Sequence, residues 1–312
     1  MKIIRSAILF GTLTLLMYVS VFFGLAKVES SEIPLLNHAN TFYSIKGNTT
    51  YSRFWEFNPV GFDVVVYGSS HAYRGYDPRN FEEVGLSCYN LGSSSQSIRE
   101  TCLLIEHYPQ PEKLMIIDLY PGTFSTEGTE SASLLIANVP EDELAAKIAF
   151  ETYDWRLTNC YLKRRFDAKR QPVYRDDTDR ENYYQGYVAC SDKASKELNY
   201  KAVGKEFKPR EYSLPYFSRL VDFLEKTKAR AVFVTHPLPH SINHTEMTEF
   251  SKAVNDVLDG RYPYLNYSFS HPALFDYQDD FYDLHHLNSS GVKKFNELLI
   301  ADLVNTGLLK IQ

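Results

Sequence analysis

The sequence predicts an α/β protein built on a doubly wound, mostly parallel sheet of five strands. Short runs rich in β-branched residues alternate with longer amphipathic stretches along most of the chain. A strand, a helix and a strand within so few residues require parallel strands joined by right-handed crossovers. The 312 residues are 44% hydrophobic and 23% charged, an ordinary globular composition that can bury a sizeable core. We therefore expect one α/β domain over residues 61–312.

The amino terminus carries a hydrophobic segment long enough to cross a membrane. Lys2 and Arg5 precede an uncharged run over residues 6–26, which would form a helix of roughly 31 Å at about 1.5 Å per residue. We expect residues 1–27 to be a retained anchor or, if cleavage follows Ala26, a signal peptide. In both cases the remaining chain lies outside the cytoplasm. Residues 28–60 read as a spacer.

Charge and cysteine content narrow the classes of partner and site. The formal net charge of −6 leaves no overall basic field, so nucleic acid is not an expected partner. The four cysteines contain no CxxC pair, which argues against a thiol redox site. Export would permit disulfides, but the sequence does not choose among their possible pairings. The alternative is that all four cysteines are unpaired, buried thiols. We expect no cofactor.

A metal site is not expected either. His236, His240 and His244 recur at a spacing of four, as ligands on one helical face would. Pro237 and Pro239 interrupt this stretch and argue against a continuous helix. These histidines are therefore interpreted as surface or pocket-lining residues.

The first strand ends at a turn of small polar residues. Asp63–Tyr67 is a run of β-branched and aromatic residues, long enough for a buried strand. Gly68 allows a sharp turn, and Ser70 follows at the carboxyl edge of the sheet, where ligands bind in open α/β folds. Ser70 is a candidate nucleophile; the alternative is an ordinary turn in which serine caps the next helix.

The remaining elements follow in order. Ser97 is expected to cap a helix reaching Tyr108. The pattern changes over about 122–210, which we interpret as a largely helical insertion that lies over the strand ends and shapes a pocket. Its basic stretch, Lys163–Arg170, is expected to be a solvated helix face. The other predicted elements are strands at Ser87–Leu91, Lys113–Leu119, Ala231–Thr235 and Leu265–Phe269, and helices at Ser131–Tyr153, Tyr216–Lys228, Thr245–Leu258 and Ser290–Leu303.

The loop before the last helix carries an acid and a base. It reads DLHHLNSSG from Asp283 to Gly291. An aspartate three residues before a histidine can hold the imidazole in one tautomer and leave its other nitrogen free to accept a proton. A doubly wound sheet could bring this loop to Ser70, giving the chain order serine, aspartate, histidine.

These motifs together resemble the SGNH (GDSL-like) hydrolase superfamily. Gly68-Ser69-Ser70 stands where that family has its nucleophile turn, and His71 makes a GSSH form similar to exported alginate-acetylation and DltD-like proteins. Asp283 and His286 match the family's DxxH, and the following Leu287-Asn288 favours His286 over His285. The resemblance implies a flavodoxin-like three-layer sandwich with Ser70, Asp283 and His286 as catalytic residues.

The resemblance also implies an oxyanion hole, of which one part is missing. The backbone N–H groups of Ser70 and Gly92 would bind the oxyanion. The family's third block, GxND, has no match, because DLYPGTF follows the third strand. Losing one such donor typically costs about 2.7 to 4 kcal/mol. Gln96 or a side chain of the insertion could replace it, and we place His71, Gln96 and His236 in a possible substrate pocket.

The function predicted from these residues is acyl-ester chemistry at a bacterial cell envelope. The substrate class implied is an O-acyl group, expected to be O-acetyl, on a cell-surface polysaccharide. Hydrolysis and transfer to another sugar both remain open, and cell-envelope partner proteins are possible. The alternative is a catalytically inactive glycan-binding or assembly protein, which the missing asparagine favours. A Ser70–His286 separation within hydrogen-bond reach would discriminate between them.

Overall fold

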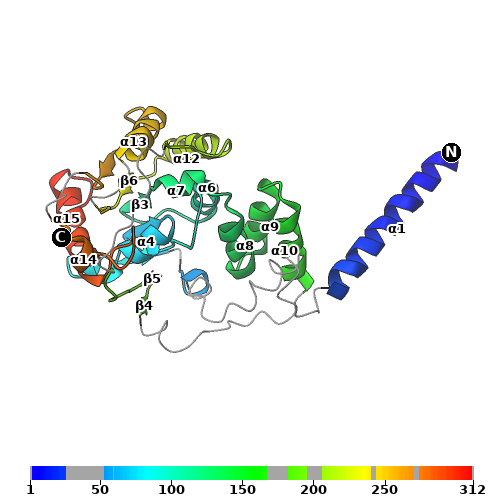
Figure 1. Ribbon diagram of the computed structural model, residues 1–312, viewed down its shortest axis with the longest axis horizontal. Coiled ribbons are helices and arrows are strands. Elements are labelled where there is room, and N and C mark those ends of the chain that lie inside the picture. Colours follow the sequence, from blue (N-terminus) through cyan, green and yellow to red (C-terminus); the bar gives the residue numbers. More distant parts are fainter. Residues whose placement is uncertain are drawn as a thin grey trace.

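A five-stranded parallel sheet forms the centre of the domain (Figure 1). The computed structural model describes residues 2–25, 53–58, 60–166, 182–194, 206–239, 244–269 and 274–310. The strand order is β2-β1-β3-β6-β7, and each neighbouring pair is parallel. This order is the flavodoxin-like one, so the predicted fold class is confirmed. The strands are β1 (Val64–Tyr67), β2 (Cys88–Asn90), β3 (Leu114–Asp118), β6 (Ala231–Thr235) and β7 (Tyr264–Asn266).

Helices cover both faces of the sheet. Val65 and Tyr67 of β1 enter one apolar cluster, whereas Val64 and Val66 enter another. Alternate residues therefore face opposite layers, as expected for parallel strands buried on both sides. The first cluster includes α6 (Ile98–His107), α12 (Ser213–Thr227) and α13 (His244–Leu258); the second includes α4 (Ser70–Gly75), α5 (Pro78–Glu82) and α15 (Ser289–Asn305).

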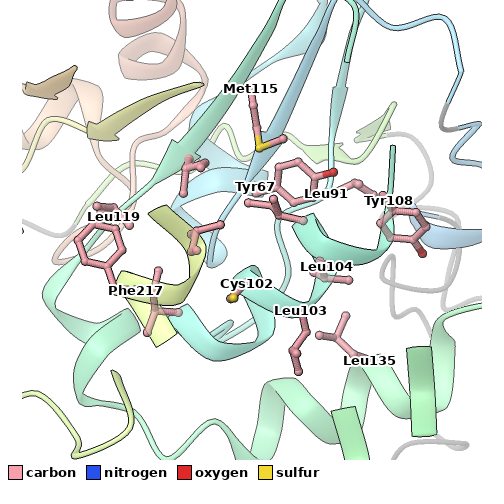
Figure 2. Close-up of a cluster of buried hydrophobic side chains, with 14 of the residues drawn as sticks. Tyr67, Leu91, Cys102, Leu103, Leu104, Tyr108, Met115, Leu119, Leu135 and Phe217 are labelled. Carbon is pink, nitrogen blue, oxygen red and sulfur yellow. The ribbon is translucent and has the colours of Figure 1, made fainter. Parts of the chain in front are cut away.

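Figure 2 shows the first cluster, where Tyr67 and Met115 of the sheet lie with Leu104 of α6. Cys102 belongs to this cluster, but Cys88 belongs to the one on the opposite face. The sheet therefore separates these two thiols, and the pairing between them that the sequence left open does not form.

Side-chain caps fix where the helices begin. Ser97 and Glu100 form a capping box at the start of α6, as the sequence predicted for Ser97. Asn288 caps α15 by accepting hydrogen bonds from the N–H groups of Ser290 and Gly291. Such caps are each worth about 1 kcal/mol. The α15 cap also fixes the point at which the preceding DLHH loop ends.

The insertion is mostly helical, but its first predicted helix is divided. The single helix expected at Ser131–Tyr153 is wrong, because Pro140 lacks an N–H and Val139 before it is extended. Two short strands, β4 (Tyr183–Tyr184) and β5 (Tyr187–Val188), form a hairpin later in the insertion. The helices are α7 (Pro121–Ser125), α8 (Thr129–Asn138), α9 (Asp142–Glu151) and α10 (Trp155–Phe166).

The basic stretch is not wholly a solvated helix face, as we had expected. Arg164 of α10 is only 1% exposed. Its Nη1 donates to the carbonyls of Ile136 and Val139 at the end of α8, and its Nε and Nη2 bond Asp142 of α9. Arg164 therefore joins three helices of the insertion. Arg165 is exposed, and the stretch beyond Phe166 lies outside the described residues.

The amino-terminal helix α1 (Lys2–Leu25) extends away from the domain and contacts it where the Tyr18 hydroxyl donates to Asn159 Oδ1 of α10 (Figure 1). Its segment Lys2–Val21, with mean hydropathy 1.7, is long and apolar enough to be a membrane span or a signal sequence. Its large apolar side chains, such as Phe10 and Leu16, are exposed. Ala26 and most of the predicted spacer lie outside the described residues.

Candidate active site

The predicted site residues gather at the carboxyl edge of the sheet. Ser70 follows β1, Tyr120 follows β3 and His236 follows β6, and these three strands are adjacent. The loop Phe281–Leu287, which lies between α14 (Tyr277–Asp280) and α15, comes to the same edge. The edge between β1 and β3 is the switch point of a flavodoxin-like sheet, where ligands bind in this topology.

The turn after β1 separates the capping serine from the candidate nucleophile. Gly68 has φ = 148°, and a Cβ there would lie 2.9 Å from the Asp118 Cβ, so only glycine fits. Ser69 is the cap of α4, with its Oγ accepting from the His71 N–H. Ser70 is then the first residue of the helix, and its hydroxyl is free of any capping role.

Ser70, His286 and Asp283 form a continuous hydrogen-bonded row. Ser70 Oγ lies 2.8 Å from His286 Nε2, and His286 Nδ1 lies 2.8 Å from Asp283 Oδ2. The carboxylate can only accept, so the imidazole proton is on Nδ1. Nε2 is therefore the nitrogen that can take the Ser70 proton. His285, the competing imidazole, does not contact Ser70 in this way.

Asp283 is held in place by the main chain of its own loop. Its Oδ1 accepts the N–H groups of His285 at 2.9 Å and His286 at 2.8 Å. Burial works against the ionised carboxyl, but the His286 hydrogen bond and these two amides outweigh it. They hold the pKa of Asp283 well below its usual value. The aspartate therefore remains ionised and orients His286.

His286 is poised to act as a base near neutral pH. Burial lowers its pKa below the ordinary value of 6.5, while the hydrogen bond to Asp283 opposes the shift. The Tyr282 ring stacks on it, with centroids 5.4 Å apart and planes 7° apart. The imidazole is thus neutral at pH 7 and confined in orientation.

A second row of hydrogen bonds runs from Ser69 through His71 to His285. His71 Nδ1 lies 3.3 Å from Ser69 Oγ, and His71 Nε2 lies 2.9 Å from His285 Nδ1. Because Ser69 Oγ already accepts the His71 main-chain N–H, its own proton is available to His71 Nδ1. In the tautomer in which Ser69 donates, the His71 proton is on Nε2 and His285 Nδ1 accepts it.

Both of these histidines are neutral. Burial lowers the pKa of His71 well below its usual value, the neighbouring histidines lower it further, and a hydrogen bond to the His285 backbone opposes them. Burial and His286 lower the pKa of His285 to about 4. With Nδ1 accepting, neutral His285 carries its proton on Nε2.

His236 was predicted to line the pocket. It is instead buried and contacts the main chain of His285. It is 1% exposed. Its Nε2 donates to the His285 carbonyl at 3.3 Å, and its Nδ1 lies 3.4 Å from Asp118 Oδ2. Tyr76 Oη also donates to that oxygen, at 2.8 Å.

Two groups of these side chains bring potential metal ligands together. They are His71 with His285 and His286, and His71 with Asp118 and His236, each with ligand atoms within 4.8 Å of one another. However, the His71 and His236 rings stack with centroids 4.2 Å apart and planes 26° apart. A metal ion lies in the plane of each imidazole that binds it, and stacked rings direct their lone pairs along separate planes. The arrangement fits hydrogen-bonded imidazoles better than a metal centre.

A pocket of about 240 Å³ opens beside Ser70. Its lining includes Tyr120, which follows β3, together with Thr123 from the start of the insertion and His285. Sequence reasoning anticipated that the insertion would shape a pocket, and Thr123 does. The volume is below the roughly 300–1,000 Å³ of sites that enclose drug-sized ligands, so it suits a short acyl group.

Two predicted pocket groups are already engaged. The Gly92 N–H, expected in the oxyanion hole, donates to Asn90 Oδ1 at 3.0 Å. Gln96 lines the pocket but is 0% exposed, with its amide bonded to Ser93 and Thr101. The Gly92 N–H is therefore not available in this conformation, whereas only one of the two N–H groups of the Gln96 amide is used, by Thr101.

Ser95 is a pocket residue that sequence reasoning missed. Its φ is 50°, in the left-handed region, and it lines the pocket beside Ser70. Its hydroxyl donates to Glu130 of α8. Within the described part of the chain, no hydrogen bond uses the Ser95 N–H. The run SSSQS was the available signal, but its backbone conformation depends on a partner in the insertion.

Comparison with known proteins gives structural likeness alone. No protein-family model and no curated protein matches the chain. Among solved structures, GDSL-like lipases and carbohydrate esterases are similar to it.

The family two carbohydrate esterase from Clostridium thermocellum is 10% identical and covers 81% of this chain and 67% of its own, with a TM-score of 0.40. A GDSL-like lipase from Bacteroides thetaiotaomicron is 11% identical over 82% of this chain and 98% of its own, at TM-score 0.41. An acetyl xylan esterase is 10% identical over 77% and 99%, at 0.40. With these identities and with TM-scores below 0.5, the likenesses carry no argument about function, and the proposal below rests on the geometry of the site.

Proposed function

We propose that this protein is an exported serine esterase or O-acyltransferase that acts on O-acyl groups, chiefly O-acetyl, of a cell-surface polysaccharide. The observation that carries the proposal is the row Ser70–His286–Asp283, with 2.8 Å at each link. This separation lies within the 2.6–3.2 Å range expected of a nucleophile and its base.

In the proposed mechanism, Ser70 Oγ attacks the ester carbonyl while His286 Nε2 takes its proton. His286 then returns the proton to the departing sugar oxygen, leaving an acyl group on Ser70. Water or a second sugar hydroxyl attacks that acyl group, and the same nitrogen accepts and returns a proton. Asp283 stabilises the imidazolium formed in each step.

Three donors are proposed for the oxyanion: the N–H groups of Ser70 and Ser95 and the Nε2–H of His285. The last would replace the missing family asparagine. His285 lines the pocket and is neutral, and its partner His71 directs its proton to Nε2. Such preorganised donors stabilise charge that develops only as the carbonyl is attacked.

The rest of the proposal concerns place and acceptor. Helix α1 would attach the protein to the membrane or direct its export, leaving the domain in the bacterial cell envelope, where partner proteins could present the polymer. The choice between hydrolysis and transfer depends on which acceptor reaches the acyl-enzyme.

The test is labelling of the full chain, in detergent, with a fluorophosphonate probe followed by peptide mapping. We expect a label on Ser70 that is lost in Ser70→Ala and His286→Ala, together with hydrolysis of 4-nitrophenyl acetate that falls by roughly 10⁴- to 10⁶-fold in both variants. Absence of label and of hydrolysis in folded wild-type protein would favour the alternative, an inactive glycan-binding or assembly protein.

A further inference from the structure

We propose that a second pocket, next to the candidate active site, binds an uncharged sugar unit of the acylated polymer. This inference rests on the proposed function, because it concerns where the polysaccharide lies while one acyl group reacts. The second pocket would supply the surface that recognises the polymer, which the small pocket at Ser70 lacks.

The second pocket is larger and more polar than the first. Its volume is about 560 Å³, inside the range typical of small-molecule sites. It lies where the amino-terminal ends of α6 and α8, the α9–α10 connection and the segment before α12 meet. The pocket at Ser70, at about 240 Å³, has room for the acyl group but not for a polymer that carries it.

Arg99 provides unused hydrogen-bond donors in this pocket. The residue is 5% exposed, its Nε donates to Glu100 at 3.0 Å, and its guanidinium lies 4.4 Å over the Tyr212 ring. In the part of the chain that the structure describes, no hydrogen bond uses Nη1 or Nη2. Because Arg99 lines the pocket, water can bond these donors until a ligand hydroxyl replaces it.

The charges of the pocket favour a neutral ligand over an anion. Three arginines in the lining are matched by three carboxylates. Arg156 is paired with Asp154 through two nitrogens, and Arg210 bonds Glu127. An anion would meet these carboxylates, whereas sugar hydroxyls can both donate to them and accept from the arginines.

The two pockets share a wall, formed by residues 126–130. Thr126 lines the pocket at Ser70, and Glu127 and Thr129 line the second one. The Thr126 carbonyl accepts the Tyr212 hydroxyl at 2.7 Å, from the side of the second pocket. This one chain segment is therefore all that separates a polymer bound in the second pocket from the reacting ester.

The test measures binding on the full chain carrying Ser70→Ala, so that it does not depend on turnover. Isothermal titration with cellohexaose, xylohexaose and maltohexaose is expected to give a Kd of about 0.1 to 1 mM for at least one of them. Adding Arg156→Ala should weaken that Kd at least about fivefold. Arg99→Lys, which keeps the charge but removes the forked donors, should weaken it similarly; if it does not fold, Arg156→Ala decides.

The matched control is Arg261→Ala, which removes another ion-paired arginine, bonded to Asp222 and Glu225 far from either pocket. Its Kd should equal that of the parent. Binding of hexagalacturonate alone, no binding of any neutral hexamer, or equal Kd values for Arg156→Ala and the parent would each overturn the inference. An inactive wild-type enzyme that still binds sugar would instead contradict the proposed function.

Discussion

The two pockets on either side of residues 126–130 are built by different means. At Ser70 the main polar groups are imidazoles, each neutral or paired with a single carboxylate. They are mostly buried and are held by hydrogen bonds to one another. In the second pocket they are arginines and carboxylates, of which several, such as Arg156 and Glu127, stay partly exposed. Catalysis requires each proton to be held on one particular atom. Recognition of sugar hydroxyls, by contrast, tolerates side chains that change conformation. We therefore expect substitutions in the first pocket to affect rate by orders of magnitude and those in the second to affect binding modestly.

The largest effect should come from Asp283→Asn, which tests the first half of this comparison. Asparagine can still accept the two loop amides, but it does not fix the His286 proton on Nδ1. We expect kcat for 4-nitrophenyl acetate to fall by about 10⁴-fold. A thermal melt close to that of wild type would show that the fold is retained, and a loss below tenfold would mean that Asp283 does not orient the base.

A smaller effect is expected at His285. Removing one oxyanion donor typically lowers kcat by about 10²- to 10³-fold, so His285→Ala should lose roughly that factor with little change in KM. His285→Gln, whose amide keeps an N–H donor, should lose less. Equal losses in the two variants would assign His285 a packing role instead.

The smallest effect concerns pH. His286 must be neutral to accept a proton, and burial lowers its pKa below 6.5. The kcat/KM of the wild type should therefore rise with pH along an acid limb whose midpoint lies below 6.5. In Asp283→Asn the charge that opposes this shift is absent, so the midpoint should move lower still. A wild-type midpoint above 6.5 would be incompatible with the buried, neutral imidazole described above.

The strand ends and the pairing of Asp283 with His286 were accessible from the sequence because both depend on local signals, whereas the flavodoxin-like fold and the catalytic role of Ser70 with this pair came from the family resemblance. A β-branched run followed by glycine marks a strand end. An aspartate three residues before a histidine can reach it within one loop. These features need no knowledge of distant contacts.

Groups that were misjudged or missed depend on contacts that the local pattern hides. Ser95 keeps its left-handed backbone beside Glu130, 35 residues away, and Arg164 is buried by carbonyls 25 and 28 residues earlier. Gln96 lines the pocket as predicted, and its side-chain amide also bonds its near neighbours Ser93 and Thr101. The boundary between α8 and α9 is different, because Pro140 is a local signal in the sequence that predicts it.

The hydrogen bond between Ser70 and His286 joins residues 216 positions apart. Its two halves are held together by α15, where Asn296 donates to the Gly75 carbonyl at 2.7 Å and accepts the Asp77 N–H at 2.8 Å. A chain that is still being synthesised has Ser70 but not yet His286. In the proposed mechanism Ser70 is therefore unactivated until the last helix has docked.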